Sequence, residues 1–246
     1  MFGPLHITMI VVSLVICVLV TILFTKMSFK NILRTLLICC IVSEFIKIFG
    51  YIIRNLDKLG GYLPKTDLPF HLCSIQIIFI IILNVSKNEK FKKIILSFML
   101  PSCLIGAFAA IMIPASTPIS SFSMITIQYF PYHAILMSFA IYLYISKEIT
   151  FTLRDYYTSI AMLFVVFFIA IYINSILYDG VSNINFMYVV NPPVDNLPIL
   201  NKENGWVSYI IRYSIICLLA VSMCYIPTFI KEIKNRKKAK EEVIVS

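Results

Sequence analysis

The chain has 246 residues, of which 60% are hydrophobic and only 13% are charged. Its mean hydropathy of +0.91 excludes an ordinary soluble domain, which needs far more polar surface. The formal net charge of +9 does not indicate nucleic-acid binding, because the sequence contains no soluble segment with a basic face.

Apolar runs of about twenty residues recur along the chain, and a helix of that length crosses a bilayer. The sequence therefore predicts an all-α membrane protein with seven transmembrane helices. These are residues 6–25, 32–53, 69–85, 94–114, 131–145, 159–178 and 206–229. They form one transmembrane domain, residues 1–230, followed by a basic cytoplasmic tail, residues 231–246.

Lysine and arginine residues are distributed unevenly between the two sides of these helices. The segments after the first, third and fifth helices, together with the tail, hold 15 of them, including Lys147; the opposite segments hold four, including Arg54 and Lys58. Because positive residues favour the cytoplasmic side, we expect the N-terminus outside and the C-terminus inside the cell. The protein is then an integral, multi-pass protein of the plasma membrane.

Each of the three histidines follows a proline by two residues, and each lies at the start of an odd-numbered helix. His6, His71 and His133 are therefore expected near the outer surface of the membrane. A helix N-terminus has unpaired N–H groups and a partial positive charge, so it favours a neutral imidazole that can act as a base, and it can bind an oxyanion. For His6 we favour a purely interfacial position, and for the other two we expect a function.

Cys73 lies two residues after His71, and such positions point to nearly opposite sides of a regular helix. A direct pair of the two therefore requires an irregular first turn, or Cys73 meets His133 instead. Two roles remain open for this cysteine. It is either a nucleophile activated by a neighbouring base, or a small hydrophobic residue in the core.

Further polar residues are expected in the same outer half of the membrane. Glu44 and Lys47 in the second helix either pair with each other or line a functional cavity. Arg212 in the seventh helix either reaches the interface or binds a phosphate. The candidate hydrogen-bonding residues are Gln76, Tyr132, Asn174 and Asn185. This one-sided distribution favours an outward-facing polar site.

Three short motifs carry a resemblance to a known family: LPFHLCSIQ (68–76), PYHAILM (131–137) and NFMYVVNPP (185–193). They resemble the bacterial YwaF-type integral membrane proteins and, more distantly, the eukaryotic transmembrane ether-phospholipid acyltransferase. The resemblance covers nearly the whole chain. It implies a seven-helix fold and acyl transfer between membrane lipids, with His71, His133 and Asn185 as site residues. The thiol of the eukaryotic pattern directly precedes the histidine, where this chain has Phe70, so Cys73 departs from that pattern.

These observations together predict an acyltransferase at the outer leaflet. His71 or His133 is the expected general base, and the nucleophile is either Cys73 or the hydroxyl or amine of the acceptor itself. The expected donor is a membrane phospholipid, and the expected acceptor is a lysophospholipid or a lipoprotein N-terminus. The prediction includes neither a cofactor nor a metal ion.

The remaining polar residues have supporting roles in this hypothesis. Helix N-termini, together with Asn185 or Gln76, would stabilise the oxyanion. Arg212 and Lys47 are the candidates for binding the phosphate of the donor.

Three alternatives stay open at this stage. A transporter places charged residues within a helical bundle, but the inner half of this chain is almost purely apolar. A metal hydrolase would use His6, His71 and His133 as three ligands. A non-enzymatic sensor would bind a ligand in an outer pocket and act through a partner protein.

Overall fold

The computed structural model describes residues 2–59, 63–114, 122–146, 149–194, 197 and 199–245. Lys147 and Ser246, which belong to the predicted charge pattern and tail, lie outside these residues. The side chains of Arg54 and Lys58 are likewise outside the described part. All regular secondary structure among the described residues is helical, in agreement with the predicted all-α class.

The helices follow one another in this order: α1 (Pro4–Thr25), α2 (Phe29–Leu59), η1 (Lys65–Asp67), α3 (Leu72–Val85), α4 (Glu89–Pro101), η2 (Ser102–Gly106), α5 (Ala107–Met112), α6 (Met124–Ile145), α7 (Leu153–Leu177), η3 (Phe186–Tyr188), α8 (Gly205–Cys224) and α9 (Ile226–Val245).

Six segments within the described residues are helical, apolar and long enough to cross a membrane, so the protein is a multi-pass membrane protein. They are Pro4–Thr25, Phe29–Ile53, Glu89–Met112, Met124–Ile145, Leu153–Leu177 and Gly205–Cys224. The predicted third span is shorter than expected, because α3 has only 14 residues. At 1.5 Å per residue it is about 21 Å long, less than the hydrocarbon thickness of about 30 Å. The expectation of seven full-length spans therefore fails at this helix.

The predicted fifth helix begins earlier than the sequence pattern indicated. α6 starts at Met124, after Ser123, whose hydroxyl accepts a hydrogen bond from the backbone N–H of Thr126 at 3.2 Å. Pro131 lies inside this helix rather than in its first turn. The start expected at Pro131 was therefore wrong, because a capping serine upstream allows the helix to continue through the proline.

α4, η2 and α5 form one continuous helix with a π-helical turn at its centre. Asn88 caps the start through its side chain, which accepts from the N–H of Phe91 at 3.1 Å. The turn from Ser102 to Gly106 directly follows Pro101, which has no N–H to donate within the helix. Single π-helical turns are often found at functional sites. This one brings Ser102 and Gly106 to the cavity described below.

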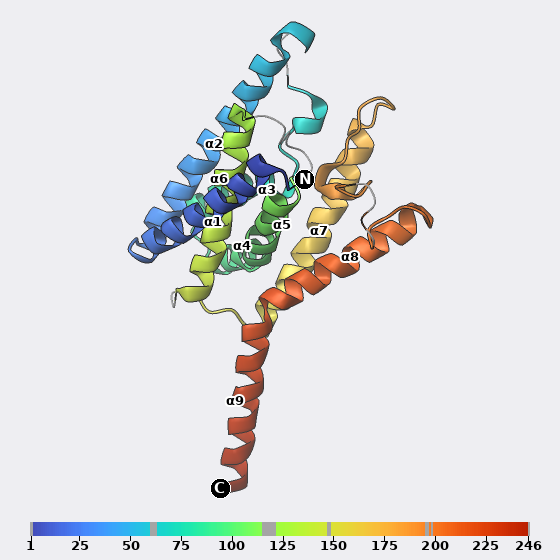
Figure 1. Cartoon of the computed structure of the whole chain (residues 1–246). Coiled ribbons are helices and arrows are strands. Elements are labelled where there is room, and N and C mark those ends of the chain that lie inside the picture. Colours follow the sequence, from blue (N-terminus) through green and yellow to red (C-terminus); the bar gives the residue numbers. More distant parts are fainter. Residues whose placement is uncertain are drawn as a thin grey trace.

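α6 is the central helix, and most of its residues are buried. It packs against α1, α2 and the η2–α5 segment, while α4 packs against α7 (Figure 1). α1 and α2 expose many apolar side chains, including Leu19 and Phe45, which are 62% and 70% exposed. Such a large apolar surface is consistent with contact to lipid.

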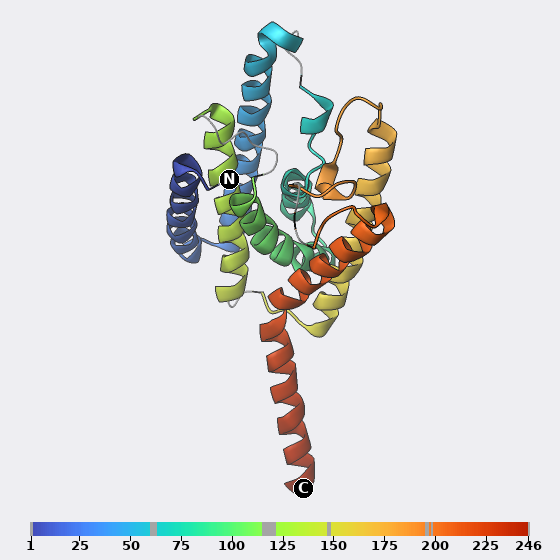
Figure 2. The same cartoon turned by 45° about the vertical axis from the view of Figure 1, so that its right-hand side comes forward.

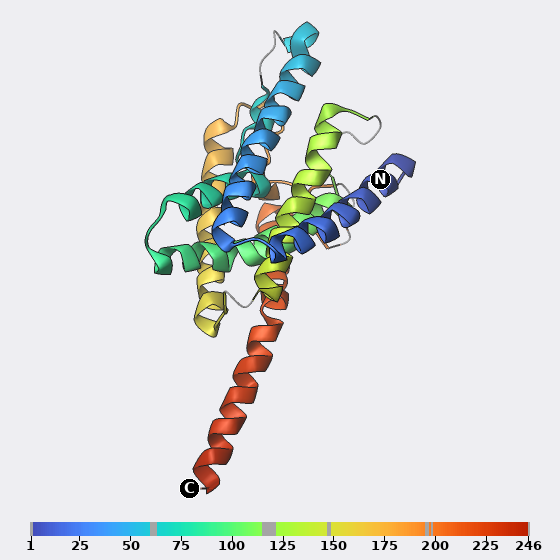
Figure 3. The same cartoon turned by 90° about the vertical axis from the view of Figure 1, so that its left-hand side faces the viewer.

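The two ends of the bundle differ. The far end of α2, η1 and the segment after α7 lie at one end of the molecule, and α9 projects from the other (Figures 1, 2 and 3). The predicted tail is thus part of a helix that already begins at Ile226. η1 and the segment after α7 thus lie at the end of the molecule opposite to α9 (Figures 1, 2 and 3).

Candidate functional site

The chain enters α3 through a non-helical histidine. His71 precedes the first helical residue, Leu72, and has extended backbone angles of φ −72° and ψ 153°. In a regular helix, His71 and Cys73 would point to nearly opposite sides. That geometry does not apply here, because only Cys73 lies in the helix. Both residues line one cavity of about 180 Å³.

His133 lines the same cavity, although it occupies the middle of α6 and is only 2% exposed. Its expected place at a helix N-terminus was wrong, because α6 begins nine residues earlier, at Met124. The ring Nδ1 is 2.7 Å from the carbonyl oxygen of Tyr129. Since a carbonyl only accepts, Nδ1 carries the hydrogen, and the Nε2 of the neutral ring has a free lone pair.

The Glu44–Lys47 pair is present. The Lys47 Nζ lies 2.6 Å from the Glu44 carboxylate and 3.4 Å from the hydroxyl of Ser74, in the first turn of α3. Glu44 and Lys47 do not line the cavity. The contact of Lys47 with Ser74 connects α2 to α3.

Gln76 and Tyr132 position the backbone around the cavity rather than lining it. The Gln76 amide donates to the carbonyl of Leu72 at 3.2 Å and to the hydroxyl of Ser102 at 3.1 Å. Its oxygen accepts from the Cys103 thiol at 3.4 Å. This side chain thus joins α3 to the π-helical turn.

The Tyr132 hydroxyl donates to the carbonyl of Cys73 at 2.8 Å and also contacts the sulfur of Cys40 at 3.8 Å. Tyr132 therefore fixes the first turn of α3 relative to α6.

Asn174 and Asn185 use their side-chain amides to hold the segment after α7. Asn174 donates to the carbonyl of Phe186 at 3.0 Å and accepts from its N–H at 2.8 Å. Asn185 accepts from the N–H groups of Val190 and Asn191 and donates to the Asn191 carbonyl. Both amides are thereby engaged with backbone, so these residues shape the loop and neither lines the cavity.

This loop delivers aromatic residues to His71. The rings of Phe186 and Tyr188 have centroids 5.2 Å and 5.8 Å from that of His71. Met187 and Tyr188 have positive φ angles of 56° and 55°, which are uncommon for residues with a side chain. Two neighbouring residues in this conformation need strong support from their surroundings.

That support comes from three aromatic residues of α8, which were not among the predicted site residues. Trp206 donates to the Val189 carbonyl at 2.9 Å, Tyr209 donates to the Tyr188 carbonyl, and Tyr213 donates to the Met187 carbonyl at 2.9 Å. Three consecutive carbonyls are thus paired with one face of one helix. The spacing of the three aromatic donors, at positions i, i+3 and i+7, was the available signal.

Arg212 and His6 lie away from the cavity. The Arg212 guanidinium donates to the backbone carbonyl of Asn201 at 2.8 Å and to its side-chain oxygen at 3.2 Å. His6 accepts from the N–H of Phe2 at 3.1 Å through Nδ1, so its Nε2–H donates to the Ile111 carbonyl at 3.0 Å. His6 is only 1% exposed and is held between the backbones of Phe2 and Ile111, rather than lying free at the interface as expected.

The position of His6 also removes the geometric basis of the three-histidine metal site. Within the described residues, no group of three or more histidine, cysteine, aspartate or glutamate side chains is placed to hold a metal ion.

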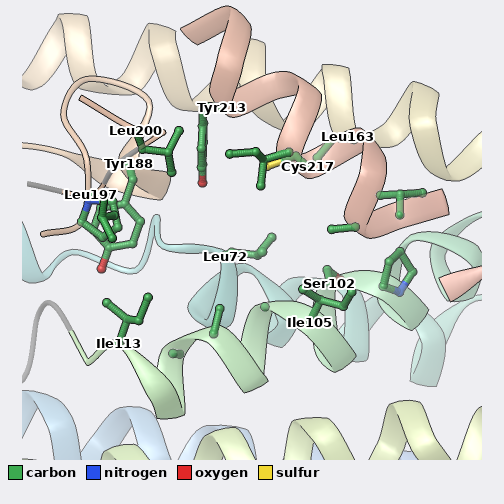
Figure 4. A pocket seen from close by; sticks show the side chains of 18 of the residues that line it. Leu72, Ser102, Ile105, Ile113, Leu163, Tyr188, Leu197, Leu200, Tyr213 and Cys217 are labelled. Atoms are coloured by element: carbon green, nitrogen blue, oxygen red, sulfur yellow. The ribbon is translucent and has the colours of Figure 1, made fainter. Parts of the chain in front are cut away.

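A second cavity, of about 350 Å³, adjoins the first. The two share lining residues from α3, η2 and α8, among them Leu72, Ser102, Tyr213 and Cys217. Figure 4 shows Leu72 and Ile105 on one side of this space and Tyr213 and Cys217 on the other. Its lining is almost entirely apolar, so the polar site continues into a space suited to hydrocarbon.

Fold and cavities together define a multi-pass helical membrane protein in which a histidine-lined cavity is joined to an apolar one. The model of the TMEM164 family, a family of transmembrane proteins, matches residues 1–225. The chain belongs to this family. No curated protein and no solved structure matches the chain.

Proposed function

We propose that this protein is an integral acyltransferase of the plasma membrane. It moves a fatty acyl chain from a phospholipid to a lysophospholipid or a lipoprotein amine at the outer leaflet. The observation that carries the proposal is the shared cavity of His71, His133 and Cys73, which opens into an apolar space. The resemblance of the three motifs to the eukaryotic acyltransferase points in the same direction.

His133 has the features of a general base. Its Nδ1–H is held by the Tyr129 carbonyl, and the free Nε2 lone pair can accept a proton from a nucleophile. His71 is the second candidate for this role, because it lines the same cavity. In the step that forms the acyl bond, the base takes the proton of the attacking thiol, hydroxyl or amine.

The nucleophile then attacks the carbonyl carbon of the donor ester. The bond from that carbon to the glycerol oxygen breaks, and the leaving oxygen takes the proton from the imidazolium, which releases a lysophospholipid. If Cys73 attacks, a thioester forms, and a deprotonated acceptor then attacks it and restores the thiol. If the acceptor attacks the donor ester directly, the imidazole takes the proton of the acceptor and passes it to the leaving oxygen, and no thioester forms.

The first turn of α3 supplies donors for the developing oxyanion. No side chain caps this helix, so its first N–H groups are not paired with a capping residue. Leu72 and Cys73, from this turn, both line the cavity. Backbone N–H groups in such a position can stabilise negative charge on the carbonyl oxygen of the donor.

The experiment uses the purified protein in liposomes that contain a labelled phospholipid, and mass spectrometry measures lysophospholipid release and acyl-acceptor formation. Wild type is compared with His71→Ala, His133→Ala and Cys73→Ser. Cys39→Ser is the matched control, because Cys39 lies on α2 and does not line the cavity. Loss of transfer in both histidine variants, with the control active, supports the proposal.

No transfer by the wild type, across several donors and acceptors, contradicts it. Measurements of solute uptake and of ligand binding then address the transporter and sensor alternatives.

A further inference from the structure

A third cavity extends the apolar space toward the C-terminal end of α8. It has a volume of about 480 Å³ and lies between α8, the η2–α5 segment and α6. Ile105, Ile216 and Ala220 line both this cavity and the 350 Å³ cavity. The histidine-lined cavity adjoins the apolar cavity, and the apolar cavity adjoins this outermost cavity, so the three lie in a series.

The outermost cavity lies at the surface of the bundle. Phe108, Leu219 and Met223 line it and are 50%, 59% and 63% exposed. All of its lining side chains are apolar, so it offers nothing to a headgroup or to water. In a membrane protein, a surface of this kind faces the lipid hydrocarbon.

The length of the series matches that of a lipid chain. Lining residues on α8 run from Tyr213 to Met223, which is about 15 Å along the helix at 1.5 Å per residue. This is about half of the 30 Å hydrocarbon thickness, or roughly one leaflet. The polar end of the series holds the histidines and Cys73, and the far end is hydrocarbon-like throughout.

We infer that a phospholipid acyl chain enters sideways between α5 and α8, and that Ile105 and Ala220 determine which chain lengths are accepted. The placement of the ester at the histidines rests on the proposed function, whereas binding of the chain does not. Ile105 and Ala220 lie where the two apolar cavities meet, and a methyl side chain at position 220 leaves this passage open. A larger side chain there shortens the space available to the chain.

Two variants test this inference in opposite directions. Ala220→Phe narrows the passage, and Ile105→Ala widens it. Ala161→Phe is the matched control, because Ala161 is an exposed residue of α7 that does not line the three cavities. Each protein is purified from membranes of mixed chain length, and native mass spectrometry identifies the bound species, separating intact phospholipids from free fatty acids.

The expected result is a change of about tenfold in the ratio of long-chain to short-chain phospholipid bound, since even one methylene group is discriminated by about that factor in an apolar pocket. The ratio falls in Ala220→Phe, rises in Ile105→Ala and stays at the wild-type value in Ala161→Phe. A folded Ala220→Phe protein with the wild-type ratio overturns the inference. So does the recovery of free fatty acids alone.

The same proteins are then assayed with long-chain and short-chain donors. A shifted binding ratio with no transfer from any donor leaves the chain-binding inference intact and contradicts the proposed function. Transfer that occurs in all variants with an unchanged chain preference supports the proposed function and contradicts the role of Ile105 and Ala220.

Discussion

His133 donates its Nδ1 hydrogen to the carbonyl oxygen of Tyr129, 2.7 Å away and four residues earlier in α6. The bond selects the tautomer with a lone pair on Nε2, and His133 lines the cavity shared with His71 and Cys73. Replacement of His133 by alanine is therefore expected to lower acyl transfer by about 10²- to 10⁴-fold, the usual contribution of a general base. The rate of lysophospholipid release measures this effect.

The role of His133 as general base has its own control. His133→Gln keeps a polar side chain of similar size but lacks the basic nitrogen, so it is expected to fold and remain inactive. Wild-type activity in a folded His133→Gln protein would contradict the role of His133 as base and leave His71 as the candidate.

Cys73→Ser separates the two routes of attack. If a thioester forms, the variant loses transfer strongly, because a serine hydroxyl is a much weaker nucleophile than a thiolate. If the acceptor attacks directly, its activity stays close to that of the wild type. Intact-mass spectrometry of the protein mixed with donor alone gives an independent measurement, since only the thioester route adds the mass of an acyl group.

The hydrogen bond from Tyr213 to the Met187 carbonyl supports the left-handed backbone beside His71. Tyr213→Phe removes the donor and leaves that carbonyl unpaired, so we expect a loss of about 1–3 kcal/mol in the free energy of unfolding. Thermal unfolding in detergent measures it. Tyr172→Phe is the control, because Tyr172 is a 68% exposed residue of α7. Equal melting temperatures for the two variants would contradict a supporting role of Tyr213.

Lys47 and Glu44 form a largely buried pair, with side chains 15% and 20% exposed. Lys47→Met leaves the carboxylate without its partner, and we expect a loss of about 3 kcal/mol, near the lower end of the cost of breaking a buried pair. The double variant Lys47→Met/Glu44→Gln should recover most of this stability. A double variant as unstable as the single one would show that Lys47 acts mainly through Ser74.

Lys65 and Asp179 connect the loop before α3 with the loop after α7, with Nζ and Oδ2 3.0 Å apart. The pKa of the Asp179 carboxyl is lowered below its usual value, first by the backbone N–H of Ser182 and then by the Lys65 side chain. Because this pKa is lower in the folded protein, the interactions of the ionised Asp179 carboxylate with Ser182 and Lys65 contribute stability at neutral and mildly acidic pH. That stability is lost only as the pH falls below the ordinary carboxyl pKa of about 3.9.

Limited proteolysis of the segment after α7 tests this prediction. In the wild type, the cleavage rate should stay constant from neutral to mildly acidic pH, whereas Asp179→Asn should be cleaved faster throughout. Glu89→Gln, which removes a different exposed ion pair, is the control. Equal rates for Asp179→Asn and this control would exclude a role of the contact in holding the two loops together.

The sequence by itself determined the class of the protein. Long apolar runs require helices in a bilayer, because backbone N–H and C=O groups have no other partners there. Local patterns also gave the Glu44–Lys47 pair, since residues three apart on a helix are neighbours.

The site itself was decided by tertiary structure. Pro131 indicated a helix start, but a proline is also tolerated inside a helix whose other contacts support it, and so His133 lies in the middle of α6. The extended backbone at His71 allows both His71 and Cys73 to line one cavity, which a regular helix would have prevented.

Tertiary structure also decided which predicted residues do not belong to the site, namely Asn174, Asn185 and Arg212. As polar residues in an apolar chain they were reasonable candidates for a site, yet their side chains are bound to the backbone of the loops after α7. Residue type predicts that a buried polar group needs partners, whereas only the packing of distant segments decides which partners it finds.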